Sequence, residues 1–99
     1  MKNFRTFNLA VNFAKDCRQL SISRQLRDQL LRASQSIVLN LAEGRGKPTV
    51  KDQKRFFAIA FGSVRECQAI LILEELQQAE IAQRLDTLAA HLYKLMQAM

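Results

Sequence analysis

Residues 26–71 read LRDQLLRASQSIVLNLAEGRGKPTVKDQKRFFAIAFGSVRECQAIL, and this stretch decides the fold because it joins two long helical patterns through one short break. Before the break, apolar residues recur every three or four positions, which is the spacing of one face of an α-helix. This spacing predicts a helix over residues 23–43, with the hydroxyl of Ser21 or Ser23 as its N-terminal cap. The predicted inner stripe is Ile22, Leu26, Leu30, Ala33, Ile37 and Leu41.

The break is the segment GRGKPT, residues 44–49. Gly44 is expected to end the helix, because glycine adopts the left-handed conformation of many helix C-termini without steric cost. Pro48 opposes continuation because its ring nitrogen carries no proton to donate. Two helices are therefore expected to meet at this loop.

After the break, Thr49 and Asp52 resemble a capping box that opens a third helix over residues 50–76. The segment AILILEEL in this helix is apolar on nearly all sides, which favours burial on several sides or cover by a partner subunit. The polar QQAE that follows is predicted to be the next turn. The predicted inner stripe is Phe56, Ala60, Ser63 or Val64, Cys67 and Leu71.

The flanking segments complete the set with helices over residues 4–20 and 80–97. The last helix repeats Ile81, Leu85, Leu88, Leu92 and Leu95, the alternating spacing of knobs-into-holes packing. In the first helix, Leu9 and Phe13 lie off the main stripe, so two burial partners are expected. That main stripe is Phe4, Phe7, Val11, Ala14 and Cys17. Four helices with short links predict an all-α, antiparallel up-and-down four-helix bundle, with residues 1–99 as one domain.

Composition narrows the class of protein. The chain has 99 residues, 48% of them hydrophobic, and a single proline, which agrees with one helical domain. Cys17 and Cys67 stand among apolar residues without metal-ligand spacing and are expected to be buried free thiols. The N-terminal segment lacks the pattern of a signal peptide, and no uncharged apolar run reaches membrane-spanning length. The expected location is the cytoplasm, with no membrane partner.

Positive charge is concentrated in the first half of the chain. Residues 1–55 hold twelve Lys or Arg and four acids, whereas residues 56–99 hold three and five, so the net charges are +8 and −2. A basic half suits phosphates or an acidic protein, although a solvated basic rim has the same composition. The residues proposed for nucleic-acid binding are Arg24, Arg27, Arg32, Arg45, Lys47, Lys51, Lys54 and Arg55.

Residues for catalysis or for holding a cofactor are lacking in the sequence. His91 is the single histidine and has Leu88 three residues before it, so the Glu-x-x-His motif of di-iron bundles is absent. GRGKPT lacks the first half of a Walker motif, and a serine hydrolase would depend on His91 alone. The expectation is a protein without enzymatic activity, cofactor or metal.

Residues 26–71 resemble the family of four-helix-bundle proteins encoded in intervening sequences of bacterial 23S ribosomal RNA genes. Two departures are Val38, where the family usually has proline, and a short first connection without the usual proline-containing loop. The flanking helices agree in pattern only. The residues that carry the resemblance are Gln29, Arg32, Ala33, Ser36, Ile37, Asn40, Ala42, Glu43, Gly44, Phe56, Ala60, Gly62, Ser63 and Glu66.

The resemblance implies a homopentamer with no known enzymatic activity and a link to nucleic acid. A related branch, the accessory proteins of diversity-generating retroelements, implies binding to a reverse transcriptase as well. The family motif also has structural interpretations. Asn40 and Glu43 are expected to bond to a neighbouring helix, through Ser63 or the backbone, and Gly62 with Ser63 is expected to let two helices approach closely.

Two functions follow as hypotheses. The first is a non-catalytic homo-oligomeric bundle that binds RNA or DNA through phosphates. The alternative is a protein-interaction subunit for a reverse transcriptase or another nucleic-acid enzyme.

Overall fold

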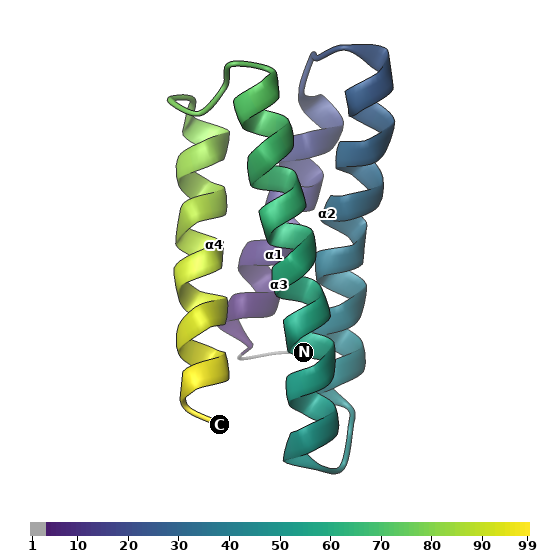
Figure 1. Ribbon diagram of the computed structural model, residues 1–99, viewed down its shortest axis with the longest axis vertical. Helices are drawn as coiled ribbons and strands as arrows, with labels where there is room; N and C mark the ends of the chain where they lie inside the picture. Colours follow the sequence, from purple (N-terminus) through teal and green to yellow (C-terminus); the bar gives the residue numbers. More distant parts are fainter. Residues whose placement is uncertain (1–3) are drawn as a thin grey trace.

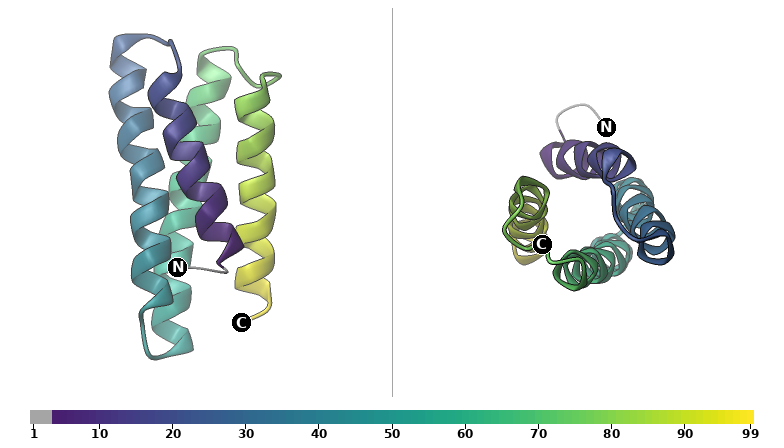
Figure 2. Two further views of the ribbon diagram at one scale, coloured as in Figure 1. Left: turned by 180° about the vertical axis from the view of Figure 1, so that it is seen from behind. Right: turned by 90° about the horizontal axis from the view of Figure 1, so that it is seen from above.

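The computed structural model describes residues 4–99, which form four α-helices and no strand. Each helix runs antiparallel to the one before it, and seen from above the four surround one axis in chain order (Figures 1 and 2). The contacts join α1 to α2, α2 to α3, α3 to α4 and α4 to α1. The all-α fold is confirmed. The helices are α1 (Arg5–Gln19), α2 (Arg24–Arg45), α3 (Val50–Leu73) and α4 (Glu80–Gln97).

The core follows the sequence pattern closely in α2 and α4. In α2 the predicted stripe is buried at Leu30, Ala33, Ile37 and Leu41, while Ile22 and Leu26 are partly buried at its end. In α4 the stripe is buried from Ile81 to Leu92, and Leu95 packs against its edge. In both helices the predicted stripe is the one that the core uses.

The predicted stripe of α1 is wrong by one residue along most of its length. Phe4 and Cys17 are buried as expected, but Thr6, Ala10 and Phe13 fill the positions between them. Phe7, Val11 and Ala14 lie at the side and are only partly buried. The physical reason is that α1 packs against both α2 and α4. Its buried face therefore points between these two helices, and the predicted stripe lies to one side of that direction.

Helix α3 differs from the prediction at two places. Its inner face uses Phe57 and not Phe56, whereas Val64, one of the two predicted alternatives at the next position, is buried. It also ends at Leu73, before the expected turn at QQAE.

The early end of α3 has a local cause. The backbone N–H of Leu76 donates to Leu71 and that of Glu75 to Ile72, the pair of bonds of a Schellman motif. Glu75 takes the left-handed conformation, with φ of 59°, at the position where glycine is usual. Because the turn residue is not glycine, the sequence pattern did not reveal it.

Gly44 packs two helices together and does not end one. The helix continues to Arg45 with Gly46 as C-cap, and neither glycine has a positive φ. Gly44 is buried, and a Cβ atom placed on it would lie 2.7 Å from Cε1 of Phe57 and 3.0 Å from Cβ of Phe56. The prediction for Gly44 is therefore corrected: its missing side chain allows α2 and α3 to approach closely next to their connecting loop.

Gly62 has no such role within the subunit. No atom lies within 4 Å of the position of a Cβ at Gly62, which contradicts the expected close helix approach there. Ser63 does connect the two helices, because its hydroxyl donates to Oγ of Ser36 at 2.9 Å. Asn40 donates to the carbonyl and hydroxyl oxygens of Ser36, which is in the same helix, so the predicted bond from Asn40 to a neighbouring helix is wrong. Glu43 instead pairs with Lys47 on its own side of the loop.

The α1–α2 connection is held by Arg27 rather than by a serine cap. The guanidinium of Arg27 donates to the carbonyl oxygen of Leu20 at 2.6 Å and to that of Arg18 at 3.0 Å. Ser23 is the N-cap residue, but its side chain makes no capping bond, and its N–H donates to Glu74. Thr49 does cap α3 as predicted, accepting from the N–H of Asp52 at 3.2 Å.

We expect Gly44→Ala to lower the free energy of unfolding by about 1–3 kcal/mol, because the new methyl group overlaps Phe57 in a packed core. This loss exceeds the gain of about 1 kcal/mol that alanine brings to a helix interior. Urea denaturation of the two proteins measures the difference. Gly46→Ala is the matched control, because its Cβ would meet nothing closer than 3.7 Å. Equal stability of the Gly44 and Gly46 variants would contradict this assignment.

We expect Arg27→Ala to destabilise the fold by about 1–2 kcal/mol, because two carbonyl oxygens at the end of α1 lose a charged donor. Arg24→Ala serves as the comparison, since Arg24 is exposed in the same turn of α2. Thermal unfolding followed by circular dichroism tests the pair. A loss of the same size in both variants would show that Arg27 contributes only its charge.

Candidate nucleic-acid interface

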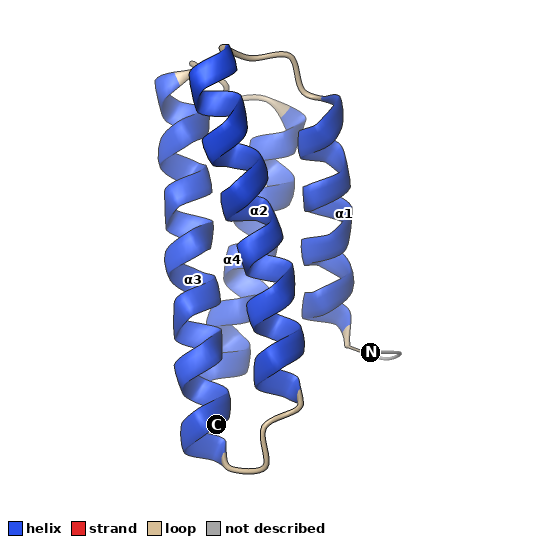
Figure 3. Ribbon diagram, turned by 90° about the vertical axis from the view of Figure 1, so that its right-hand side faces the viewer, coloured by secondary structure: helices blue, strands red, loops and turns tan. Residues whose placement is uncertain are grey.

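The structure places two of the eight proposed cationic residues at one end of the bundle, five at the other end, and Arg32 between them. Arg24 and Arg27 lie in the first turn of α2, beside the α1–α2 connection. The 22 residues of α2 span about 33 Å at 1.5 Å per residue, so these two arginines are far from the other end. Five residues lie in or beside the α2–α3 loop at that other end, which extends beyond α1 and beyond the C-terminal end of α4 (Figures 1 and 3). We call them the basic tip: Arg45, Lys47, Lys51, Lys54 and Arg55.

The three arginines outside the basic tip differ in what they can offer a ligand. Arg27 is engaged by the carbonyl oxygens that end α1. Arg32 forms an ion pair with Glu66 across the α2–α3 contact, with Nη2 and Oε2 2.7 Å apart. Arg24 is exposed but isolated at the far end. The predicted set therefore does not form one surface.

The lysines of the basic tip include two without an ionic partner. Lys51 and Lys54 are exposed on the first turns of α3, and neither is in an ion pair with any residue of the described part of the chain. Lys51 lies where the dipole and free N–H groups of a helix N-terminus favour anions over cations. An exposed lysine at this position is thus better stabilised with an anion beside it than without one.

Phe56 organises the other cations of the basic tip. The guanidinium carbon of Arg55 lies 5.0 Å from the centre of its ring, and Nζ of Lys47 lies 5.1 Å from the same centre. Both distances fit cation–π contacts. The guanidinium carbon of Arg45, the last residue of α2, lies 4.5 Å from the ring centre of Phe4. These rings hold cations in place while leaving their N–H groups free to bind.

The role of Phe56 was missed at the level of the sequence. The predicted inner stripe of the third helix placed Phe56 in the core. The one available signal was the pair of adjacent phenylalanines, since only one of two neighbours on a helix can point into the core. Phe57 takes the core position, which leaves Phe56 beneath the cations.

Two carboxylates reduce the charge of the basic tip without cancelling it. Residues 43–55 contain five cations and two acids, for a net charge of +3. Oε2 of Glu43 lies 3.1 Å from Nζ of Lys47. Asp52 is the residue whose backbone N–H donates the capping bond of α3. The remaining positive charge is carried by residues on both sides of the loop.

The titratable groups elsewhere do not form a reactive site. Cys17 and Cys67 are free and buried, as predicted, and desolvation by burial raises the pKa of Cys17 to about 12 and that of Cys67 further still. Both thiols are therefore protonated at neutral pH, a state that is neither a nucleophile nor a metal ligand. Within residues 4–99, no group of three or more His, Cys, Asp or Glu is placed to hold a metal ion.

Comparison with known proteins gives one family. The family model described as 23S rRNA-intervening sequence protein matches residues 2–99, which is nearly the whole chain. No curated protein matches at a significant level. The match extends the resemblance of residues 26–71 to the flanking helices that agreed only in pattern. The chain belongs to the 23S rRNA-intervening sequence protein family.

Proposed function

We propose that this chain is a non-catalytic, self-associating bundle that binds RNA or DNA phosphates through the basic tip. The observation that carries this proposal is the gathering of five cations at one protruding end, of which only Lys47 is in an ion pair with another residue of the described range 4–99. The family name connects such proteins with ribosomal RNA, which agrees with a phosphate ligand. The basic tip contains the five of the eight predicted cationic residues that lie together.

The chemistry of the basic tip fits a phosphate backbone better than a single small anion. The five cations occupy both sides of a loop and the first turns of α3, so their charges are spread along a surface and do not converge on one pocket. Contacts of this kind release condensed counterions and give binding that falls steeply with salt. They also position a protein on nucleic acid without reading its sequence.

Partial immobilisation of the cations supports the same proposal. Lys47 and Arg55 rest on Phe56, and Arg45 rests on Phe4, so these long side chains have less conformational freedom to lose on binding. The faces of both rings are covered by cations of the protein itself. Contact with phosphates is therefore favoured over stacking on bases, which needs an open aromatic face.

Self-association would convert a modest patch into an effective binding surface. Each copy brings one basic tip, and linked tips act on one strand at high effective concentration without a new type of contact. Helix α3 supports association because much of its apolar surface is not buried within the subunit. By length and composition it is apolar enough to cross a membrane, yet only 33% of its most apolar window is buried. Because its inner face packs in the bundle core, the unburied part is better suited to another subunit than to lipid. Five subunits are what the family resemblance implies.

A reversal of charge at the basic tip should abolish binding. We expect Lys51→Glu with Lys54→Glu to reduce affinity for RNA and for duplex DNA at least tenfold at low salt, because both unpaired cations become repulsive. The slope of log affinity against log salt should also become shallower by roughly 0.7–0.9 for each lost phosphate contact. Fluorescence anisotropy over a salt series measures both quantities.

The matched control is Arg24→Glu with Arg65→Glu, which changes the net charge equally but alters residues away from the basic tip. It should retain most of the affinity. Equal losses in the two variants would mean that general charge and not the basic tip is responsible. Absence of binding by the unaltered protein at low salt would reject the nucleic-acid proposal and favour a protein partner such as a reverse transcriptase.

A further inference from the structure

Helix α3 has an apolar face that no residue of the described range 4–99 covers. We call the residues on this side the outer face of α3. Ile59 is 47% exposed and Leu73 is 67% exposed. Gly62 lies between them with open space around it, so contacts within the subunit do not explain the absence of a side chain there. The outer face of α3 consists of Ala58, Ile59, Gly62, Glu66, Ala69 and Leu73.

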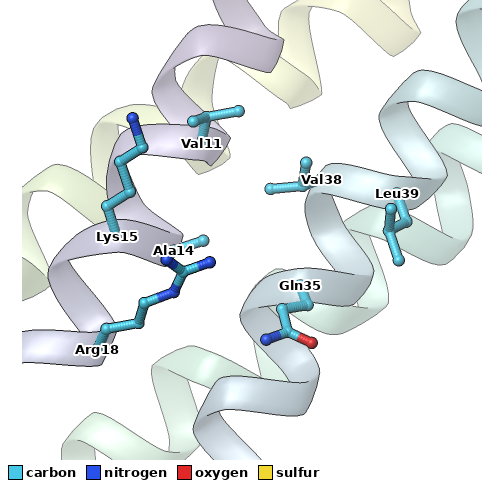
Figure 4. A pocket seen from close by; sticks show the side chains of 7 residues that line it. All are labelled: Val11, Ala14, Lys15, Arg18, Gln35, Val38 and Leu39. Atoms are coloured by element: carbon cyan, nitrogen blue, oxygen red, sulfur yellow. The ribbon is translucent and has the colours of Figure 1, made fainter.

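A second unfilled surface lies between α1 and α2. Val11 and Ala14 of α1 face Val38 of α2 across it, and Leu39, 66% exposed, stands at its border (Figure 4). These are residues that the helical pattern marked as apolar but that the core does not use. Lys15 and Arg18 supply positive charge on the α1 side. We call this surface the α1–α2 groove.

The two surfaces lie at the same height along the bundle. Ser36 of α2 bonds to Ser63 of α3, and Arg32 pairs with Glu66, so residues of α2 and α3 with numbers adding to about 98 are level. Leu39 and Gln35 are thus level with the section of α3 from Ile59 to Ser63. The groove and the outer face of α3 can therefore meet when two copies stand side by side with parallel axes.

Charge is also complementary at this height. Arg18 lines the groove together with Gln35, which lies about one turn of α2 from Arg32, so Arg18 is near the level of Arg32 and hence of Glu66. The side chains of Lys15 and Arg18 make no ion pair with other residues of the described range 4–99. Among the described residues, Arg32 is the one ionic partner of Glu66, and a carboxylate can accept bonds from two cations. A neighbour's Arg18 can reach such a carboxylate.

We propose that the α1–α2 groove of one copy receives the outer face of α3 of a second copy, with Ile59 seated against Val38 and Leu39 and with Glu66 close to Lys15 and Arg18. This inference rests on the self-association in the proposed function and names the surfaces that make it. The two surfaces are different, so the contact is heterologous: each subunit uses its groove toward one neighbour and its α3 face toward the other. Repetition of such a contact closes into a ring when the rotation permits.

A mixing experiment separates this arrangement from a symmetric one. Leu39→Glu disables the groove, and Ile59→Glu disables the outer face of α3; both sites are exposed, so the subunit fold should tolerate the change. Each variant alone should be monomeric by multi-angle light scattering, whereas the unaltered protein should be larger than a dimer. An equimolar mixture should form dimers, because one intact groove and one intact α3 face remain. Asn at both positions gives a second pair of variants with the same expected pattern.

Ala90→Glu is the matched control, since Ala90 is exposed on α4 and belongs to neither surface. It should keep the mass of the unaltered protein, and circular dichroism should show the same helix content in all variants. A mixture that stays monomeric would overturn the heterologous pairing, and single variants that keep the full mass would overturn the choice of surfaces. An unaltered protein that is monomeric would reject self-association itself, whereas salt-dependent binding by the basic tip is measured independently.

Discussion

The packing of α3 constrains the rest of the structure, because this helix has more apolar surface than the bundle can bury. Its inner face meets α2 and α4 through Phe57, Ala60, Val64 and Cys67, while Ile59 and Leu73 remain in contact with solvent. At roughly 25 cal/mol for each Å² of apolar surface removed from water, covering such a face favours association. One helix therefore links the fold of the subunit to the assembly that we propose.

The close contact of α2 with α3 also positions the basic tip. Gly44 lets the two helices meet beside their loop, and the pairs Ser36–Ser63 and Arg32–Glu66 fix their register further along. This pair extends beyond α1 and beyond the C-terminal end of α4, so its loop is open to a large ligand (Figure 1). The same register places the outer face of α3 level with the α1–α2 groove. Packing within the subunit thus determines both surfaces through which it is proposed to act.

The sequence pattern predicted the architecture well because the predicted stripes of α2 and α4 are the ones that the core uses. It failed where two interpretations were nearly equal. The stripes of α1 through Val11 and through Ala10 with Phe13 are both apolar, and only the positions of α2 and α4 select the second. The sequence around Gly44 is typical of a helix end, but the role of Gly44 depends on its contact with Phe57. That contact forms only when the two helices pair.

The candidate site was predictable in composition but not in arrangement. Charge density marked residues 45–55 correctly as a cluster, since they are close in the sequence. Arg27 and Arg32 could not be separated from that cluster, because their partners, the carbonyl oxygens of α1 and Glu66, are brought near only by folding.

Burial of α3 on two sides, the central claim, is tested most directly by hydroxyl-radical footprinting at increasing protein concentration. If α3 is buried on two sides, Ile59 becomes protected as the concentration rises, while Tyr93, which is 55% exposed on α4, stays reactive. Equal labelling of Ile59 at all concentrations would contradict burial of the outer face of α3.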